Sequence, residues 1–76
     1  MGMMVTARRV EATAGEVRYE FGLDDKFDRI LTIDPSTLDA HVEDGDFDSA
    51  AGSITAKIVK TWRSSGEFPT RMLFAS

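Results

Sequence analysis

The feature of this sequence that most restricts its fold is a helical repeat of apolar and small residues between positions 46 and 65. These residues recur at spacings of three and four, which places them on one stripe of an α-helix. They are Phe47, Ala50, Ala51, Ile54, Ile58, Thr61, Trp62 and Ser65. Asp46 or Asp48 can cap the first turn, and Gly66 stands where a helix commonly ends in a left-handed residue. The pattern predicts a helix over residues 46–65 with one buried face.

The residues before this helix have the alternating pattern of a half-buried β-hairpin. Residues 16–23 alternate strictly, and their apolar positions are Val17, Tyr19, Phe21 and Leu23. A polar turn at 24–26 leads into residues 27–33, where three apolar side chains share one face and Ile30 lies on the other. The three are Phe27, Leu31 and Ile33.

Three further segments have weaker patterns. Residues 4–12 read as a strand joined to the hairpin through 13–15, and residues 71–75 read as a last strand after Pro69. Residues 37–43 fit either a short edge strand or a single helical turn. The order is therefore β-β-β-(β)-α-β within a single α+β domain over residues 1–76. We expect a small antiparallel sheet with the helix packed on one face.

The predicted core combines the buried faces of these elements. It consists of Val17, Tyr19, Phe21, Phe27, Leu31, Ile33, Phe47, Ala51, Ile54, Ile58, Trp62, Met72 and Phe74.

Composition excludes several classes of function. The formal net charge of −4 argues against a general nucleic-acid-binding surface, and the absence of cysteine excludes disulfides, thiolate metal sites and a Cys nucleophile. No apolar run is long enough to span a membrane, and the N-terminus does not resemble an export signal. The sequence has no Asn or Gln and more Arg than Lys, which favours a bacterial protein. We expect a cytoplasmic location, no catalytic residue and no cofactor.

Residues 20–48 form an acidic block, with ten acidic side chains against Lys26 and Arg29. Such a block suits a basic protein partner, because it steers the encounter and rejects acidic surfaces. The predicted function is therefore that of a small non-catalytic interaction protein, and an immunity or antitoxin protein that masks a basic nuclease is one version. The candidate partner-binding residues are Asp39, Glu43, Asp44, Asp46 and Asp48.

Part of this block begins like a calcium-binding loop of the EF-hand type. Ser49 stands where that loop requires glycine, and Thr55 stands where it requires a bidentate glutamate. We therefore expect no metal site.

Two other classes of function stay open. If residues 37–43 are a strand, His41 shares a face with Asp39 and Glu43, which would suit a small enzyme or a ligand- or metal-binding protein. The chain could also be a structural subunit of a homo-oligomer.

A homodimer is predicted from the second face of the sheet. One helix covers only one face, so Val10, Ile30 and Leu73 would form an apolar patch on the other. A symmetric copy could bury that patch and stabilise a small domain that lacks disulfides.

Overall fold

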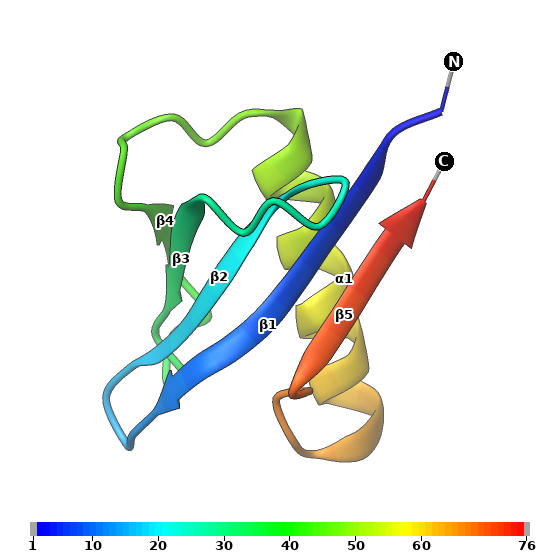
Figure 1. Cartoon of the computed structure of the whole chain (residues 1–76). Helices are drawn as coiled ribbons and strands as arrows, with labels where there is room; N and C mark the ends of the chain where they lie inside the picture. Colours follow the sequence, from blue (N-terminus) through cyan, green and yellow to red (C-terminus); the bar gives the residue numbers. More distant parts are fainter. Residues whose placement is uncertain (1, 76) are drawn as a thin grey trace.

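The computed structural model describes residues 2–75, which form one antiparallel sheet and one helix (Figure 1). The elements are β1 (Met4–Ala12), β2 (Val17–Leu23), β3 (Arg29–Ile33), β4 (Ala40–Val42), α1 (Ser49–Ser65) and β5 (Arg71–Ala75). The helix packs against one face of the sheet, so the predicted α+β class and element order are confirmed. The segment at 37–43 contributes a three-residue strand, in which Val42 pairs with Leu31 and His41 pairs with Thr32.

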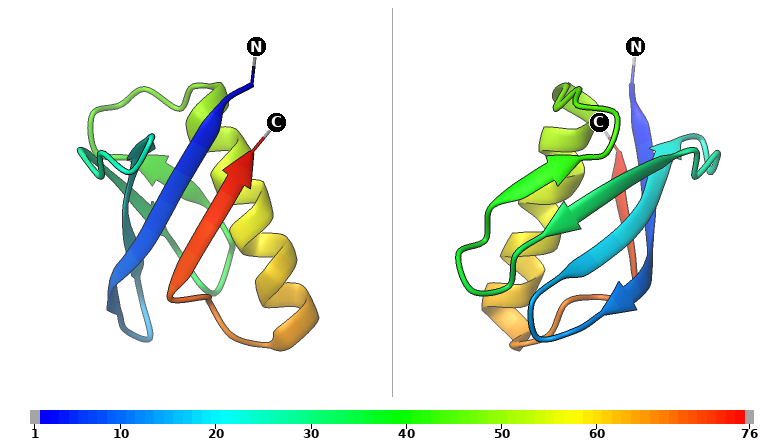
Figure 2. Two further views of the ribbon diagram at one scale, coloured as in Figure 1. Left: turned by 45° about the vertical axis from the view of Figure 1, so that its right-hand side comes forward. Right: turned by 90° about the vertical axis from the view of Figure 1, so that its left-hand side faces the viewer.

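The five strands lie in the order β4-β3-β2-β1-β5, and each neighbouring pair is antiparallel. The last strand therefore returns to pair with the first, and Met4 lies opposite Ala75. This arrangement leaves β4 and β5 as the two edge strands (Figure 2).

The helix α1 is capped at both ends, by Asp48 at its N-terminus and by Gly66 at its C-terminus. Asp48 is the N-cap, and its carboxylate accepts a 3.0 Å hydrogen bond from the backbone N–H of Ala51. Gly66 ends the helix with a φ of 81°, and its N–H donates to the carbonyl oxygen of Trp62. Because the cap is Asp48, Phe47 lies outside the helix and is 49% exposed, so its predicted place in the core is wrong.

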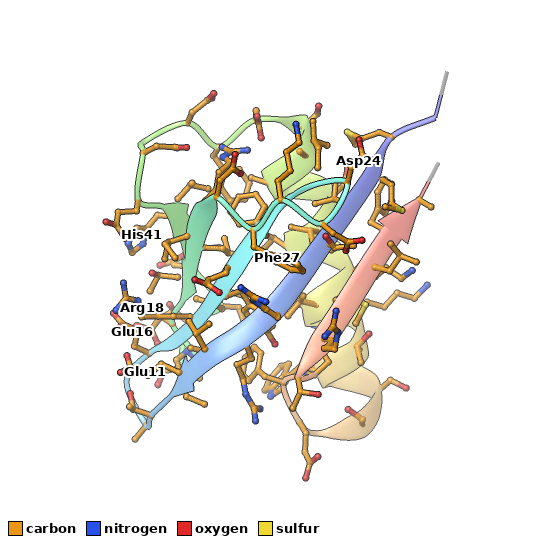
Figure 3. All side chains as sticks on the ribbon, viewed as in Figure 1. Glu11, Glu16, Arg18, Asp24, Phe27 and His41 are labelled. Carbon is orange, nitrogen blue, oxygen red and sulfur yellow. The ribbon has the colours of Figure 1, made fainter. Side chains whose placement is uncertain are left out.

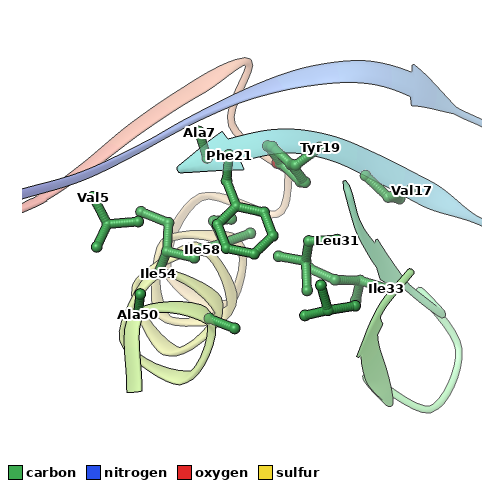
Figure 4. Packing of buried hydrophobic residues seen from close by; sticks show 12 residues of the cluster. Val5, Ala7, Val17, Tyr19, Phe21, Leu31, Ile33, Ala50, Ile54 and Ile58 are labelled. Carbon is green, nitrogen blue, oxygen red and sulfur yellow. The ribbon is translucent and has the colours of Figure 1, made fainter. Parts of the chain in front are cut away.

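The core lies between α1 and the face of the sheet that it covers (Figure 4). The predicted core residues that are buried are Val17, Tyr19, Phe21, Leu31, Ile33, Ala51, Ile54 and Ile58. The buried hydrophobic residues that the prediction missed are Val5, Ala7, Val42 and Ala50. Met72 and Phe74 are only partly buried and pack against this cluster. Trp62 is also only partly buried, and it stacks on Phe68 with 5.5 Å between ring centroids.

Phe27 is the clearest error in the predicted core. The strand β3 begins only at Arg29, and Phe27 has a left-handed φ of 45°. Its ring lies on the face of the sheet opposite α1, where the guanidinium carbon of Arg8 is 4.2 Å from the ring centroid (Figure 3). The left-handed backbone turns this side chain away from the face that Leu31 and Ile33 share.

Candidate functional site

Two loops lie at the end of the sheet where α1 begins (Figures 1 and 2). One loop joins β2 to β3 over residues 24–28, and the other joins β4 to α1 over residues 43–48. We call their acidic side chains together the acidic end. Its members are Asp24, Asp25, Asp28, Glu43, Asp44, Asp46 and Asp48.

Arg29 holds the acidic end together from the first position of β3. Its Nε donates to Oδ2 of Asp44 at 3.0 Å, and its Nη1 donates to both carboxylate oxygens of Asp48 at 3.0 and 3.1 Å. Its Nη2 donates to the carbonyl oxygen of Asp46 at 2.6 Å. One guanidinium therefore connects the sheet, the β4–α1 loop and the N-terminus of the helix.

These contacts shift the pKa values of the groups involved. The hydrogen bond from Arg29 lowers the pKa of Asp44, and the backbone N–H of Asp46 lowers it further. The pKa of Asp48 is lowered first by the N–H of Ala51 and then by Arg29. In return, the hydrogen bond with Asp44 raises the pKa of Arg29. The negative charges of Asp44 and Asp48 are therefore already paired with Arg29 of the same chain.

The other predicted partner-binding residues have different surroundings. Asp46 and Glu43 are exposed, and a carboxylate oxygen of Glu43 lies 3.6 Å from Nη2 of Arg18. Asp39 lies at the opposite end of β4, where its carbonyl oxygen accepts a hydrogen bond from the N–H of Asp34. The structure therefore brings four of the five predicted residues together and leaves Asp39 apart.

The β2–β3 loop supplies acidic side chains that the prediction did not include. Asp24 and Asp25 have left-handed φ values of 53° and 63°, a conformation that costs energy for residues other than glycine. Two hydrogen bonds hold the loop against β1: the N–H of Asp24 donates to the carbonyl oxygen of Met4, and the N–H of Asp25 donates to Oγ1 of Thr6. The signal in the sequence was the acidic composition of the turn, but its position beside residues 43–48 depends on the fold.

A hollow of about 250 Å³ lies between the two loops, and Lys26, Asp28 and Asp48 are among the residues that line it. Its volume is below the roughly 300–1,000 Å³ that is usual for a site enclosing a small molecule. The acidic end therefore suits contact with another surface better than enclosure of a ligand.

His41 lies on β4 and pairs with Thr32 on the face of the sheet opposite α1 (Figure 3). Asp39 and Glu43 fall just outside this short strand. Within residues 2–75, no three His, Asp or Glu side chains come close enough together to hold a metal ion.

The residues of the predicted dimer patch lie apart from one another. Ile30 on β3 is opposite Glu20, and Glu20 is opposite Arg8, with which it forms a 2.8 Å ion pair. Leu73 lies beyond these, on the edge strand β5. Val10 is 51% exposed and occupies the irregularity in the β1–β2 register between Arg9 and Glu11.

No protein family, curated protein or solved structure matches this chain. Among residues 2–75, no helix is both long enough and apolar enough to cross a membrane.

Proposed function

We propose that this protein is a small non-catalytic binding protein whose acidic end contacts a basic surface of a protein partner. One observation supports this proposal above the others: two loops from different parts of the chain present exposed carboxylates at the same end of the sheet. The exposed carboxylates that Arg29 does not use are Asp24, Asp25, Asp28, Glu43 and Asp46.

The loops hold these carboxylates in place before any partner binds. Arg29 fixes the β4–α1 loop, and the hydrogen bonds to Met4 and Thr6 fix the β2–β3 loop. Pre-organisation reduces the entropy lost on binding, and a cluster of like charge accelerates the encounter with a surface of opposite charge. A basic nuclease whose phosphate-binding surface would be masked is one form of such a partner.

Charge-matched variants test this proposal. The acidic-end variant carries Asp25→Asn, Asp28→Asn and Asp46→Asn, and the control carries Asp39→Asn, Glu67→Gln and Glu11→Gln, which changes the net charge equally away from the acidic end. Each protein is immobilised and exposed to a lysate of its source at low and at raised salt.

We expect the wild type and the control to capture the same basic protein, and the acidic-end variant to lose it. Binding should also weaken steeply as salt rises, because exposed charges are screened. Capture of no basic protein by the wild type, or equal loss in both variants, would contradict the proposal.

A further inference from the structure

A groove of about 480 Å³ lies between α1 and the edge strand β5, and no residue of the acidic end lines it. Figure 2 shows β5 at the border of the sheet with α1 beside it. The groove combines apolar surface from Ala56 and Phe74 with the ammonium groups of Lys57 and Lys60. Its chemistry is thus opposite in charge to that of the acidic end.

The edge of β5 presents backbone groups that point away from the sheet. The N–H of Arg9 donates to the carbonyl oxygen of Thr70, which identifies this opposed pair as hydrogen-bonded. Hydrogen-bonded and non-hydrogen-bonded pairs alternate along antiparallel strands, so the N–H and C=O groups of Arg71, Leu73 and Ala75 point outward from β1. A free edge of this kind is a template for another strand.

Lys57 covers the centre of this edge, because its Nζ donates a 2.6 Å hydrogen bond to the carbonyl oxygen of Leu73. A lysine at an edge discourages unwanted strand pairing. A backbone N–H from an incoming strand can replace the ammonium on that oxygen. The released Lys57 then becomes free to pair with a carboxylate of the incoming strand.

We propose that the β5 edge and the groove beside it bind an extended acidic segment of another protein as an additional strand. Lys57 and Lys60 supply positive charge beside the edge, and Phe74 offers apolar contact within the groove. The segment would match the five residues of β5 and carry carboxylates at alternating positions on its helix-facing side.

Charge argues against a second copy of this chain as the occupant. Antiparallel pairing of two β5 strands about Leu73 would bring the Lys57 side chains of both copies to the same place, since each donates to its own Leu73. Like charges brought together in this way are unfavourable, whereas an acidic strand is complementary.

Three synthetic peptides, each acetylated and amidated, test the proposal against the full chain. The first alternates Glu and Val, the second alternates Lys and Val, and the third is the Glu peptide with a central proline. We expect saturable binding of the first peptide, with slowed hydrogen exchange of the Leu73 N–H. The other two should not slow this exchange, because the Lys peptide has the wrong charge for the groove and the proline peptide lacks the central backbone donor.

Two protein variants separate strand pairing from charge attraction. Leu73→Pro removes the outward N–H at the centre of the edge while the ladder to β1 is kept, and Leu73→Ala is its matched control. We expect Leu73→Pro to bind the Glu peptide about tenfold more weakly than Leu73→Ala, at unchanged circular dichroism. Lys57→Ala combined with Lys60→Ala should weaken it to a similar degree.

Several results would overturn this inference. They are the absence of saturable binding of the Glu peptide, equal protection of the Leu73 N–H by the three peptides, and equal affinity of the two Leu73 variants. A dimeric mass with a protected Leu73 N–H in the absence of peptide would assign the edge to a second copy instead. The acidic-end variant should bind the Glu peptide no more weakly than the wild type does, because it loses only negative charge. This outcome does not depend on whether the proposed function is correct.

Discussion

The hydroxyl of Tyr19 donates a 2.5 Å hydrogen bond to the carbonyl oxygen of Pro69, fifty residues further along the chain. Tyr19 lies on β2 with no exposed surface, and Pro69 lies in the segment that joins α1 to β5. Arg9 holds the same segment, because its Nη1 donates to the carbonyl oxygen of Phe68 and its N–H donates to that of Thr70. The sheet therefore fixes the path by which the chain leaves the helix and enters the last strand.

Burial raises the pKa of Tyr19 to about 12, although the charge of Arg9 partly offsets the effect. An unfolded tyrosine ionises near pH 10, so the folded state keeps its proton where the unfolded state loses it. Stability should be fully present below about pH 10 and be lost as pH rises toward 12. Tyr19 is the sole tyrosine, so the alkaline absorbance change of the phenol reads it directly. In Tyr19→Phe the absorbance signal should vanish and stability should fall by about 1–2 kcal/mol at neutral pH.

Asp48 and Asp46 form a matched pair for measuring the value of the helix cap. Asp48 accepts from the N–H of Ala51 and from Arg29, whereas Asp46 contacts Arg29 through its carbonyl oxygen. We expect Asp48→Ala to lower the free energy of unfolding by about 0.5–2 kcal/mol and Asp46→Ala to change it by less than about 0.5 kcal/mol. Urea unfolding curves measure both, and an equal loss in the two variants would contradict the assignment of the cap.

The lowered pKa values of Asp44 and Asp48 predict the effect of acid. A carboxylate with a lowered folded pKa stabilises the protein above its unfolded pKa, and this stability is lost as pH falls through the folded value. Asp48→Ala should therefore lose less stability than the wild type between about pH 5 and pH 2. Parallel acid titrations followed by circular dichroism test this, and identical profiles would count against it.

Ile58 lies in the middle of the buried stripe of α1 and has no exposed surface. Removal of its buried methyl groups leaves a cavity, so Ile58→Ala should cost roughly 2–5 kcal/mol. Lys60 is exposed on the same helix, and Lys60→Ala should change the free energy of unfolding by less than about 0.5 kcal/mol. Thermal melts of the two variants that overlay would show that the stripe does not face the core.

Gly22 is required by the close approach of the β2–β3 loop. A Cβ at this position would lie 2.8 Å from Oδ1 of Asp28 and 3.1 Å from the backbone nitrogen of Phe27. Gly22→Ala should therefore displace the loop and cost about 1–3 kcal/mol. Gly15 has no atom within 4 Å of a Cβ at its position, so Gly15→Ala is the control and should be nearly neutral. Amide chemical shifts of Asp25 and Phe27 should move in the first variant and stay in the second.

The regular parts of the fold could be predicted because their side-chain periodicity decides which face is buried. Alternation along the strand was enough to predict the burial of Val17, Tyr19 and Phe21. Helical spacing was enough to predict the burial of Ile54 and Ile58. Val5 and Ala7 were missed because the adjacent Arg8 and Arg9 obscure the alternation of β1, where Arg9 faces the core side and bonds to Phe68.

The candidate site was harder to predict, because it depends on contacts between distant segments. The acidic block marked Asp44, Asp46 and Asp48, but composition does not reveal that Arg29 uses two of these carboxylates within the fold. Nor does it show that the β2–β3 loop, which carries Asp24 and Asp25, lies at the same end of the sheet (Figure 1), since that follows from the hairpin. Local patterns carry no information about such convergence.

The pairing of Met4 with Ala75 has a consequence for synthesis of the chain on the ribosome. The first strand emerges early, yet its neighbour on one side is β5, which follows the other four strands of the sheet along the chain. During that interval the hairpin and the helix can assemble, while one border of β1 stays open to strands of other nascent chains. We therefore expect a chain cut before Arg71 to expose this border of β1 and to aggregate, rather than to form a shortened but stable protein.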